Sequence, residues 1–241
     1  MSFDILKSEI KENIMIKIAV DGFTGSGKGT LCEGLAEKFN LKHLDTGAIF
    51  RGIAVGFVEL GFTELSEEIA NQNIDKLAVK VEFVGNTQKV FLNNSDVTGK
   101  LRTEQTSQMA SKVSVYSKVR EKYLAIVREF ANNYDCIIDG RDITSVVLPD
   151  ADVKIFLDAD ERVRAERRYK ENLDKHIPCT YEEVLKNLHE RDYRDSHRDI
   201  APLRKVEDAV VVDNTNLNLQ ETIDECSRII SAKLKKEGKL K

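Results

Sequence analysis

The 241-residue sequence lacks long apolar runs, paired cysteines and a large excess of charge of either sign. No run approaches the roughly 20 apolar residues that are needed to cross a bilayer. Residues 1–13 mix charged with apolar side chains, unlike the uninterrupted apolar stretch of a signal peptide. We therefore expect a cytoplasmic protein that makes no contact with a membrane, and we assign no function to this N-terminal extension.

The cysteines and histidines show none of the spacings that are typical of metal sites. The four cysteines lie far apart with no C-x-x-C pair, at Cys32, Cys136, Cys179 and Cys226. This spacing indicates reduced thiols and argues against zinc. The four histidines form no ligand pattern either: His43, His176, His189 and His197. We interpret them as surface or packing residues.

The formal net charge of -4 is too small to favour either nucleic acid or an anionic membrane surface. Any binding of phosphates must therefore come from local clusters of basic residues. The length allows a full hydrophobic core without disulfides. It predicts one α/β domain with an insertion, although two small domains would also fit. We expect small-molecule ligands, no nucleic acid and a monomer.

What the sequence does contain is a series of short apolar runs, each followed by a helical pattern. They lie at residues 15–20, 42–44, 136–138, 153–157 and 209–212. Continuous apolar runs of this kind are typical of buried parallel strands, so they predict a five-stranded parallel sheet flanked by helices. Ligands bind beyond the carboxyl ends of such strands. The polar residues directly after the runs therefore predict an active-site rim.

Between residues 62 and 115 the alternation of strand and helix breaks, which indicates an insertion. A run at 79–83 alternates apolar with charged residues, a Gly-Asn pair follows, and a second apolar run lies at 90–92. This pattern predicts a β-hairpin. Two helices are expected to lead back to the sheet, at about 104–114 and 118–131.

A glycine loop follows the first apolar run. It comprises Gly22, Phe23, Thr24, Gly25, Ser26, Gly27, Lys28, Gly29 and Thr30. A Gly-x4-Gly-Lys string between a strand and a helix is typical of a loop whose backbone amides cradle phosphates, with the lysine at the β- and γ-phosphates. Ser or Thr usually follows the lysine and holds Mg²⁺, whereas here Gly29 follows and Thr30 comes one place later. This variant favours a small-molecule phosphotransferase over a motor protein or a GTPase.

Asp139 closes the third apolar run, where an acidic residue can hold Mg²⁺ or its waters near the loop. Capping of a turn or helix would explain an aspartate at this place equally well. The candidate metal ligands are therefore Thr30 and Asp139, directly or through water. Arg141 and Asp142 follow at once, and their place at the rim favours substrate binding over a simple ion pair.

Arginines recur at helical spacing between residues 160 and 199. One helix face would carry Arg164, Arg167 and Arg168, and another Arg191, Arg194, Asp195 and Arg198. A guanidinium group binds phosphate oxygens bidentately and neutralises charge during phosphoryl transfer. The alternative is a solvated helix laced with ion pairs. Between the two faces, residues 172–180 predict the tip of a lid that excludes water.

Four motifs in this order resemble the bacterial cytidylate kinase family. They are the glycine loop, L-D-T-G-A-I-F-R at 44–51, D-G-R-D-I at 139–143 and E-R-D-Y-R-D-S-H-R at 190–198. The resemblance runs from about residue 16 to residue 233. It implies a P-loop kinase that moves the γ-phosphoryl group of ATP to CMP or dCMP with Mg²⁺. It also implies a CORE domain at 14–61 and 116–241, a helical LID at about 160–199 and a nucleoside monophosphate-binding insertion at 62–115.

The resemblance further implies roles for individual residues. The glycine loop, Arg164 and Arg167 would bind ATP. The residues that would hold CMP are Thr46, Arg51, Ser111, Arg120, Arg141, Asp142, Arg191, Asp195 and Arg198. The residues that would act in catalysis are Lys28, Arg141, Arg164, Arg168 and Arg191. Within the CMP set, Ser111, Arg120 and Asp142 match the readers of the cytosine base, and a carboxylate there would favour CMP over UMP.

The sequence departs from the family pattern in three places: Phe50 replaces a tyrosine, Phe23 replaces a proline, and Thr144-Ser145 replaces a Gly-Thr pair. They bear on substrate contacts at position 50 and on the backbone geometry at position 144. Two other functions would also use the glycine loop. One is a kinase of another small acceptor, such as a different nucleotide or shikimate. The other is a nucleotide-sensing or RNA-associated protein without kinase turnover.

Overall fold

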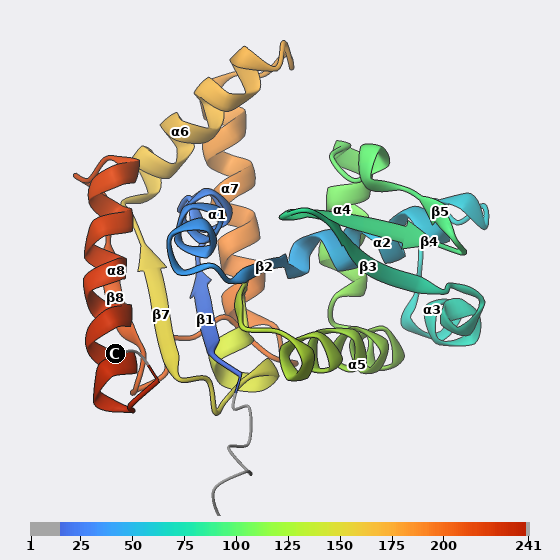
Figure 1. Ribbon diagram of the computed structural model, residues 1–241. Coiled ribbons are helices and arrows are strands. Elements are labelled where there is room, and N and C mark those ends of the chain that lie inside the picture. Colours follow the sequence, from blue (N-terminus) through green and yellow to red (C-terminus); the bar gives the residue numbers. More distant parts are fainter. Residues whose placement is uncertain (1–14, 240–241) are drawn as a thin grey trace, which may run out of the picture.

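The computed structural model describes residues 15–239, apart from the side chain of Glu104. The N-terminal extension expected at 1–13 lies outside these residues. The central sheet consists of β1 (Lys17–Gly22), β2 (Lys42–Asp45), β6 (Cys136–Gly140), β7 (Val153–Asp158) and β8 (Val210–Asp213). All neighbouring strands are parallel, in the order β2-β6-β1-β7-β8 (Figure 1). The five-stranded parallel sheet predicted from the apolar runs is therefore confirmed.

Helices cover both faces of this sheet. They are α1 (Lys28–Phe39), α2 (Thr46–Glu59), α5 (Ser117–Asn133) and α8 (Leu219–Lys236). Side chains of β1 alternate between two hydrophobic cores: Ile18 and Val20 pack with α1 and α8, whereas Ala19 packs with α2 and α5. Because packing removes both faces of β1 from water, the side chains of this strand are apolar as far as the rim.

The insertion follows α2 and contains a separate three-stranded antiparallel sheet. Its elements are α3 (Glu67–Asn73), a 3₁₀ turn (Ile74–Lys76), β3 (Val79–Val84), β4 (Thr87–Leu92), β5 (Ser95–Asp96), a second 3₁₀ turn (Thr98–Lys100) and α4 (Glu104–Val113). The predicted hairpin is confirmed, since β3 and β4 pair in antiparallel register. The sequence did not predict α3 and β5, which are too short to show a period.

Helix α2 joins the insertion to the central sheet. A Cβ atom at Gly52 would lie 2.6 Å from Cγ1 of Val90 in β4, so glycine allows the helix and the hairpin to approach this closely. The hydrophobic core on this face runs without a break from Ala19 and Leu44 of the sheet to Val90 and Leu92 of the insertion. The insertion is thereby held against the side of the sheet where α2 and α5 lie (Figure 1).

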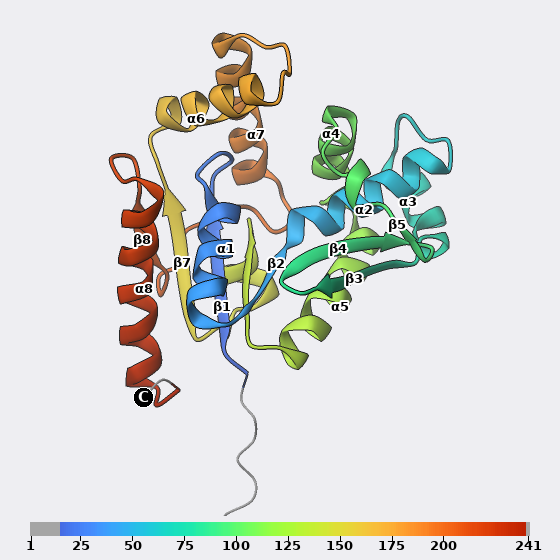
Figure 2. The ribbon, with the colours of Figure 1, turned by 45° about the horizontal axis from the view of Figure 1, so that its top comes forward.

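Helices α6 (Glu161–Asp174) and α7 (Tyr181–His197) extend beyond the carboxyl edge of the sheet (Figure 2). Asp160 caps α6, and Thr180 and Glu183 form a capping box at the start of α7. These caps fix where the two helices begin and leave residues 175–179 as their connection. Within residues 15–239 no helix has the length and apolar character to cross a membrane.

Candidate active site

The glycine loop joins β1 to α1 at the carboxyl edge of the sheet. Gly22 has a φ angle of +157°, and a Cβ atom there would lie 2.1 Å from the carbonyl oxygen of Leu157 in β7. Only glycine fits so close to the neighbouring strand. After this contact the loop leads directly into the N-terminus of α1, where free backbone amides and the helix dipole form a place for an anion.

Two adjoining cavities lie over the loop. The larger, of about 640 Å³, is lined by α6, the loop and the start of α8. The smaller, of about 390 Å³, is lined by the loop, α2, α4 and the residues after β6. The residues that line both cavities include Gly25, Gly27, Thr30, Arg51, Arg102, Arg168 and Arg191. The two cavities therefore meet at a cluster of guanidinium groups over the loop.

Two of these guanidinium groups are short of hydrogen-bond partners. The Nε atoms of Arg51 and Arg191 are buried, and neither has an acceptor among the described residues. Burial, followed by the charge of Arg141, lowers the pKa of Arg191 to about 10. A buried donor without an acceptor is costly. An anion with several oxygens, bound where the cavities meet, would supply the missing acceptors.

Lys28 lies at the base of the loop. Its ammonium group donates to the carbonyl oxygens of Gly22, at 2.8 Å, and Phe23, at 2.7 Å. Burial is the main cause that lowers the pKa of Lys28 to about 7, and the charge of Arg141 adds to it. A nearby phosphate would favour the charged form of this lysine, which agrees with the role that the loop motif predicts.

Arg141 connects the rim to α7. Its Nε donates to Oδ2 of Asp195 at 2.8 Å, and its Nη2 donates to Oγ1 of Thr24 at 2.9 Å. Burial would lower the pKa of Arg141, but the charge of Asp195 raises it above its usual value. Arg141 and Asp195 both line the smaller cavity. Arg141 thus makes an ion pair and also lines a cavity, and its contact with a substrate stays a prediction.

Arg164 occupies a different place from that expected of a phosphate-binding residue. Its Nε donates to the carbonyl oxygen of Ala159 at 2.9 Å, and its Nη1 donates to the carbonyl oxygen of Thr24 at 2.8 Å. It also pairs with Asp192 of α7, whose carboxylate accepts the amide of Thr24 at 3.0 Å. Arg164 is not among the described residues that line either cavity. It ties α6, α7 and the loop together, and its contact with ATP stays a prediction.

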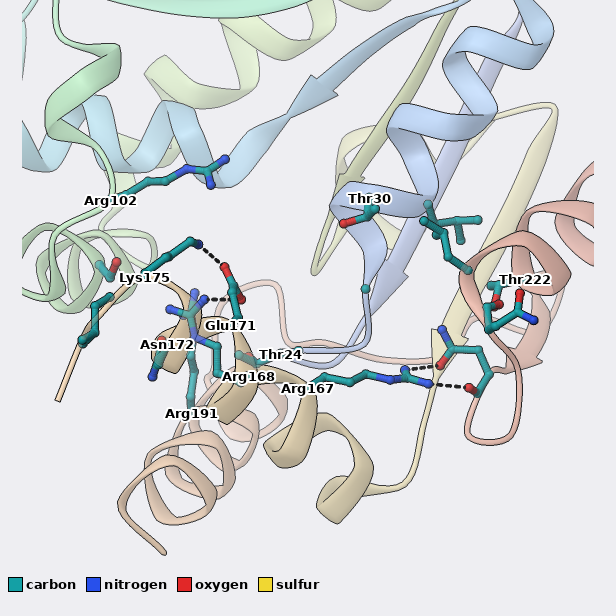
Figure 3. A pocket seen from close by; sticks show the side chains of 18 of the residues that line it. Thr24, Thr30, Arg102, Arg167, Arg168, Glu171, Asn172, Lys175, Arg191 and Thr222 are labelled. Atoms are coloured by element: carbon teal, nitrogen blue, oxygen red, sulfur yellow. Dashed lines mark hydrogen bonds and ion pairs between the residues drawn. The ribbon is translucent and has the colours of Figure 1, made fainter. Parts of the chain in front are cut away.

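Other side chains of α6 line the larger cavity (Figure 3). Arg167 donates to the side-chain and backbone oxygens of Asn214 at 3.1 and 2.8 Å, and Asn214 donates to the carbonyl oxygen of Ser26 in the loop at 3.0 Å. Arg168 and Lys175 both pair with the carboxylate of Glu171. Arg167 is therefore fixed against the loop, whereas Arg168 and Lys175 share one acidic partner in the cavity.

The predicted base readers gather at the smaller cavity. Asp142 is buried and pairs with Arg120, whose Nη1 donates to the carbonyl oxygen of Ser114 at 3.1 Å. Arg198 lies 3.9 Å from Asp142 and donates to the hydroxyl of Ser114 at 3.3 Å. The lining includes Ser111, Asp142 and Arg198, but of the described residues Arg120 is not part of it. Arg120 pairs with Asp142, and its own contact with the base stays a prediction.

The insertion determines where Arg51 lies. Nη2 of Arg51 donates to Oδ2 of Asp45 at 2.7 Å. Asp45 is held in turn by Gln88 of β4, which accepts the amide of Asp45 at 2.8 Å and donates to its carbonyl oxygen at 3.1 Å. A hydrogen-bonded chain thus runs from the hairpin to one of the guanidinium groups with a free donor.

Asp139 is the second-last residue of β6 and lines the smaller cavity together with the loop. Its carboxylate lies 2.8 Å from Nε2 of His43, and its backbone carbonyl accepts the hydroxyl of Thr46 at 2.7 Å. Burial alone would raise the pKa of Asp139, but the hydrogen bond with His43 and the charge of Lys28 keep it below the usual value. The ionised carboxylate and the hydroxyl of Thr30 line the same cavity. They fit the oxygen donors that Mg²⁺ prefers.

Two of the departures from the family pattern are aromatic packing residues. Phe50 stacks on Tyr123 with ring centroids 4.3 Å apart, and it lines the smaller cavity. Phe23 contacts Phe156 edge to face at 5.6 Å and lies beneath the guanidinium group of Arg164 at 5.1 Å. The loop therefore gains an apolar anchor at Phe23 in place of the fixed φ of a proline.

The third departure anchors a π-helix (Ile143–Val147) that follows β6. Oδ1 of Asp21 accepts the amide of Ile143 at 2.9 Å, while Oδ2 accepts the amide and the hydroxyl of Thr144 at 2.8 and 2.6 Å. Burial nevertheless raises the pKa of Asp21 to about 6. Thr144 thus supplies a hydroxyl donor that joins this turn to the end of β1.

Sequence reasoning missed several residues of the site. Arg102 of the insertion lines both cavities and has no ion pair or hydrogen bond to the described residues; Figure 3 shows its guanidinium group reaching into the larger cavity. No motif surrounds it. Asp192 lies inside the fourth motif, where its acidic side chain between two arginines was the available signal. Asn214 follows the last apolar run and so lies on the predicted rim, without a predicted role.

Known proteins resemble this chain over most of its length. A model of the cytidylate kinase family matches residues 18–232. A cytidylate kinase of Fusobacterium nucleatum is 41% identical over 217 residues, which cover 89% of this chain and 97% of the relative. A cytidylate kinase of Carboxydothermus hydrogenoformans is 39% identical over 218 residues, which cover 90% and 98%. Among solved structures, a shikimate kinase of Bacteroides thetaiotaomicron has a TM-score of 0.45 and 14% identity, with 90% of this chain and 98% of that chain covered.

Proposed function

Because the chain belongs to the cytidylate kinase family, we propose that it transfers the γ-phosphoryl group of ATP to CMP or dCMP, giving ADP and CDP or dCDP. The observation that carries the proposal is the meeting of two cavities at the unpartnered Nε atoms of Arg51 and Arg191. Each of the two cavities accepts one nucleotide, and the phosphate groups of the two nucleotides converge on these donors.

The larger cavity takes ATP. The glycine loop and the first turn of α1 bind the triphosphate, and Arg167 braces the loop through Asn214. Apolar side chains of Ile177, Leu217 and Leu219 also line this cavity and suit a purine base. The donor is thus held between the loop, α6 and α8.

The smaller cavity takes CMP or dCMP. Asp142 accepts the 4-amino group of cytosine, while the carbonyl of uracil at the same place would face the carboxylate and be repelled. Ser111 joins Asp142 at the base, and Arg198 lies beside them. Arg51 and Arg141 bind the acceptor phosphate through paired donors.

Transfer then proceeds by in-line displacement between the cavities. The acceptor phosphate is already anionic, so no covalent nucleophile or strong base is needed. Lys28 and Arg191 neutralise the charge on the γ-phosphoryl oxygens from the two sides. Arg168 breaks its ion pair with Glu171 and adds a further positive charge near these oxygens.

The same site would hold Mg²⁺ through Thr30 and Asp139, directly or through water. When bound, the ion would supply positive charge that offsets the charge of the phosphate groups. His43 orients the Asp139 carboxylate toward this task. We further propose that the protein works as a cytoplasmic monomer, with nucleotides as partners and without binding nucleic acid or membrane.

A coupled assay of ADP release tests the proposal. The metal is Mg²⁺, the donor is ATP, and the acceptors are CMP, dCMP, UMP, AMP and shikimate. Turnover should be fastest with CMP or dCMP, and Asp142→Ala should narrow the ratio of CMP to UMP turnover. Failure to make CDP while another acceptor is phosphorylated would refute the assignment, and an unchanged ratio would remove Asp142 from base recognition.

A further inference from the structure

Three side chains with different ligand atoms converge behind the glycine loop. Cys32 of α1, His43 of β2 and Asp139 of β6 each offer one ligand atom, and these atoms all lie within 4.8 Å of one another. Their wide separation in sequence hides the cluster from any spacing motif. We propose that Cys32, His43 and Asp139 form a binding site for a thiophilic divalent cation such as Zn²⁺, and that its occupation inhibits phosphoryl transfer.

The donor set selects the kind of cation. Thiolate, imidazole and carboxylate together are ligands of Zn²⁺, whereas Mg²⁺ prefers an octahedron of oxygens. Tetrahedral Zn²⁺ with ordinary bond lengths holds such ligand atoms about 3.4–3.6 Å apart. The His43 and Asp139 atoms, now 2.8 Å apart, would separate slightly, and the cysteine sulfur would move toward them. Rotations about side-chain torsions would supply these shifts.

The site has an entrance and an enclosed base. His43 and Asp139 line the smaller cavity, and their side chains are 10% and 11% exposed. Cys32 is fully buried in the core between α1 and the sheet, so it closes the inner side. A cation therefore enters past His43 and Asp139, and its fourth position faces the cavity, where water or a phosphate oxygen completes the tetrahedron.

The surrounding charge favours a cation at this point. Besides Asp139, the carboxylates of Asp45 and Glu33 line the same cavity as His43, and carboxylates attract a cation. Lys28 and Arg141 are cations that oppose it. On binding, the thiol of Cys32 becomes a thiolate and the imidazole presents an unprotonated Nε2; the displaced protons leave to solvent.

Inhibition follows because Asp139 is a proposed ligand of both Mg²⁺ and Zn²⁺. A bound Zn²⁺ would withdraw this carboxylate from Mg²⁺ and place a dication beside Lys28, whose charge the phosphates require. This consequence depends on the proposed kinase function. The binding of the cation does not depend on it, so the two are tested separately.

The binding test uses the full chain, freed of metal and titrated with Co²⁺. We expect a tetrahedral cobalt spectrum with a thiolate-to-cobalt charge-transfer band that Zn²⁺ abolishes by displacement. Cys32→Ser should lose the band. Cys226→Ser, a buried thiol in the same core, and Cys179→Ser, a partly exposed thiol, should keep it. A band that survives in Cys32→Ser, or that disappears in Cys179→Ser, would overturn the site.

Two further variants guard against a folding defect in Cys32→Ser. Cys32→Ala avoids the buried hydroxyl group that the serine variant introduces. It should also lack the band, while its circular dichroism matches that of the wild type. His43→Gln should keep the charge-transfer band but bind Co²⁺ at least about tenfold more weakly. Wild-type affinity in His43→Gln would contradict the assigned ligand set.

The inhibition test follows CMP phosphorylation in excess Mg²⁺ as Zn²⁺ is added. Wild type and Cys226→Ser should slow at the same Zn²⁺ concentration, whereas Cys32→Ser should need at least about tenfold more. Equal inhibition of Cys32→Ser would show that Zn²⁺ acts elsewhere and would overturn the inhibitory role. If the chain phosphorylated no acceptor at all, the proposed function would fail while the Co²⁺ result stood.

Discussion

Arg191 carries a buried charge that the described residues do not fully satisfy. In Arg191→Ala we expect the kcat for CMP phosphorylation to fall about 10³-fold or more, because the transferred group loses a guanidinium that stabilises its charge. The urea midpoint should stay close to wild type, since the variant removes an incompletely paired buried cation. Steady-state kinetics and urea denaturation measure the two effects.

The matched control for Arg191 is Arg228→Ala, which removes an exposed guanidinium on α8 that pairs with Glu225. It should change neither kcat nor stability. Full activity in Arg191→Ala would instead remove Arg191 from phosphoryl transfer.

Arg102 reaches the cavities from the insertion, opposite the side chains of α6. If it contacts a phosphate of ATP, Arg102→Ala should lower kcat/KM for ATP by about 10- to 100-fold, the size of one charge-assisted hydrogen bond. Arg102→Lys should recover part of the loss because it restores the charge without the fork. Initial rates over a range of ATP concentrations measure the effect.

The control for Arg102 is Lys100→Ala, two residues earlier, where an exposed ammonium pairs with Glu59. It should leave ATP kinetics unchanged. If the two variants behaved alike, the position of Arg102 in the cavity lining would have no part in donor binding.

At the scale of residues, these arginines show which positions of the site can be predicted from the sequence. Arg51 and Arg191 are found through their motifs, and the structure places both where the cavities meet. Arg164 has the same helical spacing as Arg167 but lies buried on protein carbonyls. Sequence cannot separate these cases, because a phosphate and a backbone carbonyl both satisfy guanidinium donors. Arg102 needed the folded insertion to bring it to the cavity.

At the scale of elements, the strands were predictable because a parallel strand buried on both faces must be apolar along its length. All five runs became strands, within a residue or two of the expected ends. The carboxyl edge was predictable for the same reason, since polar residues begin where burial stops. The π-helix after β6 was not, because its anchor is Asp21, more than a hundred residues away in sequence.

Asp21 makes the joint between β1 and the π-helix sensitive to pH. Its pKa rises from the ordinary 3.8 to about 6, so between these values the folded chain keeps a proton that the unfolded chain has lost. The stability that this group contributes is therefore complete below about pH 4 and decreases as pH rises to about 6. The difference in unfolding free energy between wild type and Asp21→Asn should fall over this window, by on the order of 2–3 kcal/mol.

Urea denaturation at a series of pH values measures this slope. Asp150→Asn, at an exposed position before β7, should run parallel to wild type throughout. Parallel curves for Asp21→Asn would mean that the buried carboxyl titrates alike in the folded and unfolded chains.

At the scale of the whole molecule, Gln88 links the insertion to the central sheet through both backbone groups of Asp45. Gln88→Ala should release Asp45 and, through it, Arg51. The KM for CMP should rise about 5- to 30-fold, as expected for one or two lost hydrogen bonds, while the KM for ATP stays unchanged. Initial rates with each nucleotide varied in turn separate the two constants.

Gln72→Ala is the control for this link, since among the described residues the side chain of Gln72 bonds only to Glu68 within its own helix α3. Neither KM should move in that variant. A similar rise in both constants for Gln88→Ala would point to general loosening of the fold and away from the positioning of Arg51.

The cluster of Arg164, Asp192 and Thr24 sits at the base of α6 and α7, while residues 175–179 join them at the other end. If α6 and α7 rotate together about this cluster as a pivot, the end where they are joined moves farthest. A helix of 14 residues is about 21 Å long, so a rotation of about 10° at the pivot moves its far end by about 4 Å. Arg167, one turn from the pivot, would scarcely shift. Lys175 and Ile177 would move farthest, so a small rotation beside the glycine loop would greatly change how these two residues cover the larger cavity.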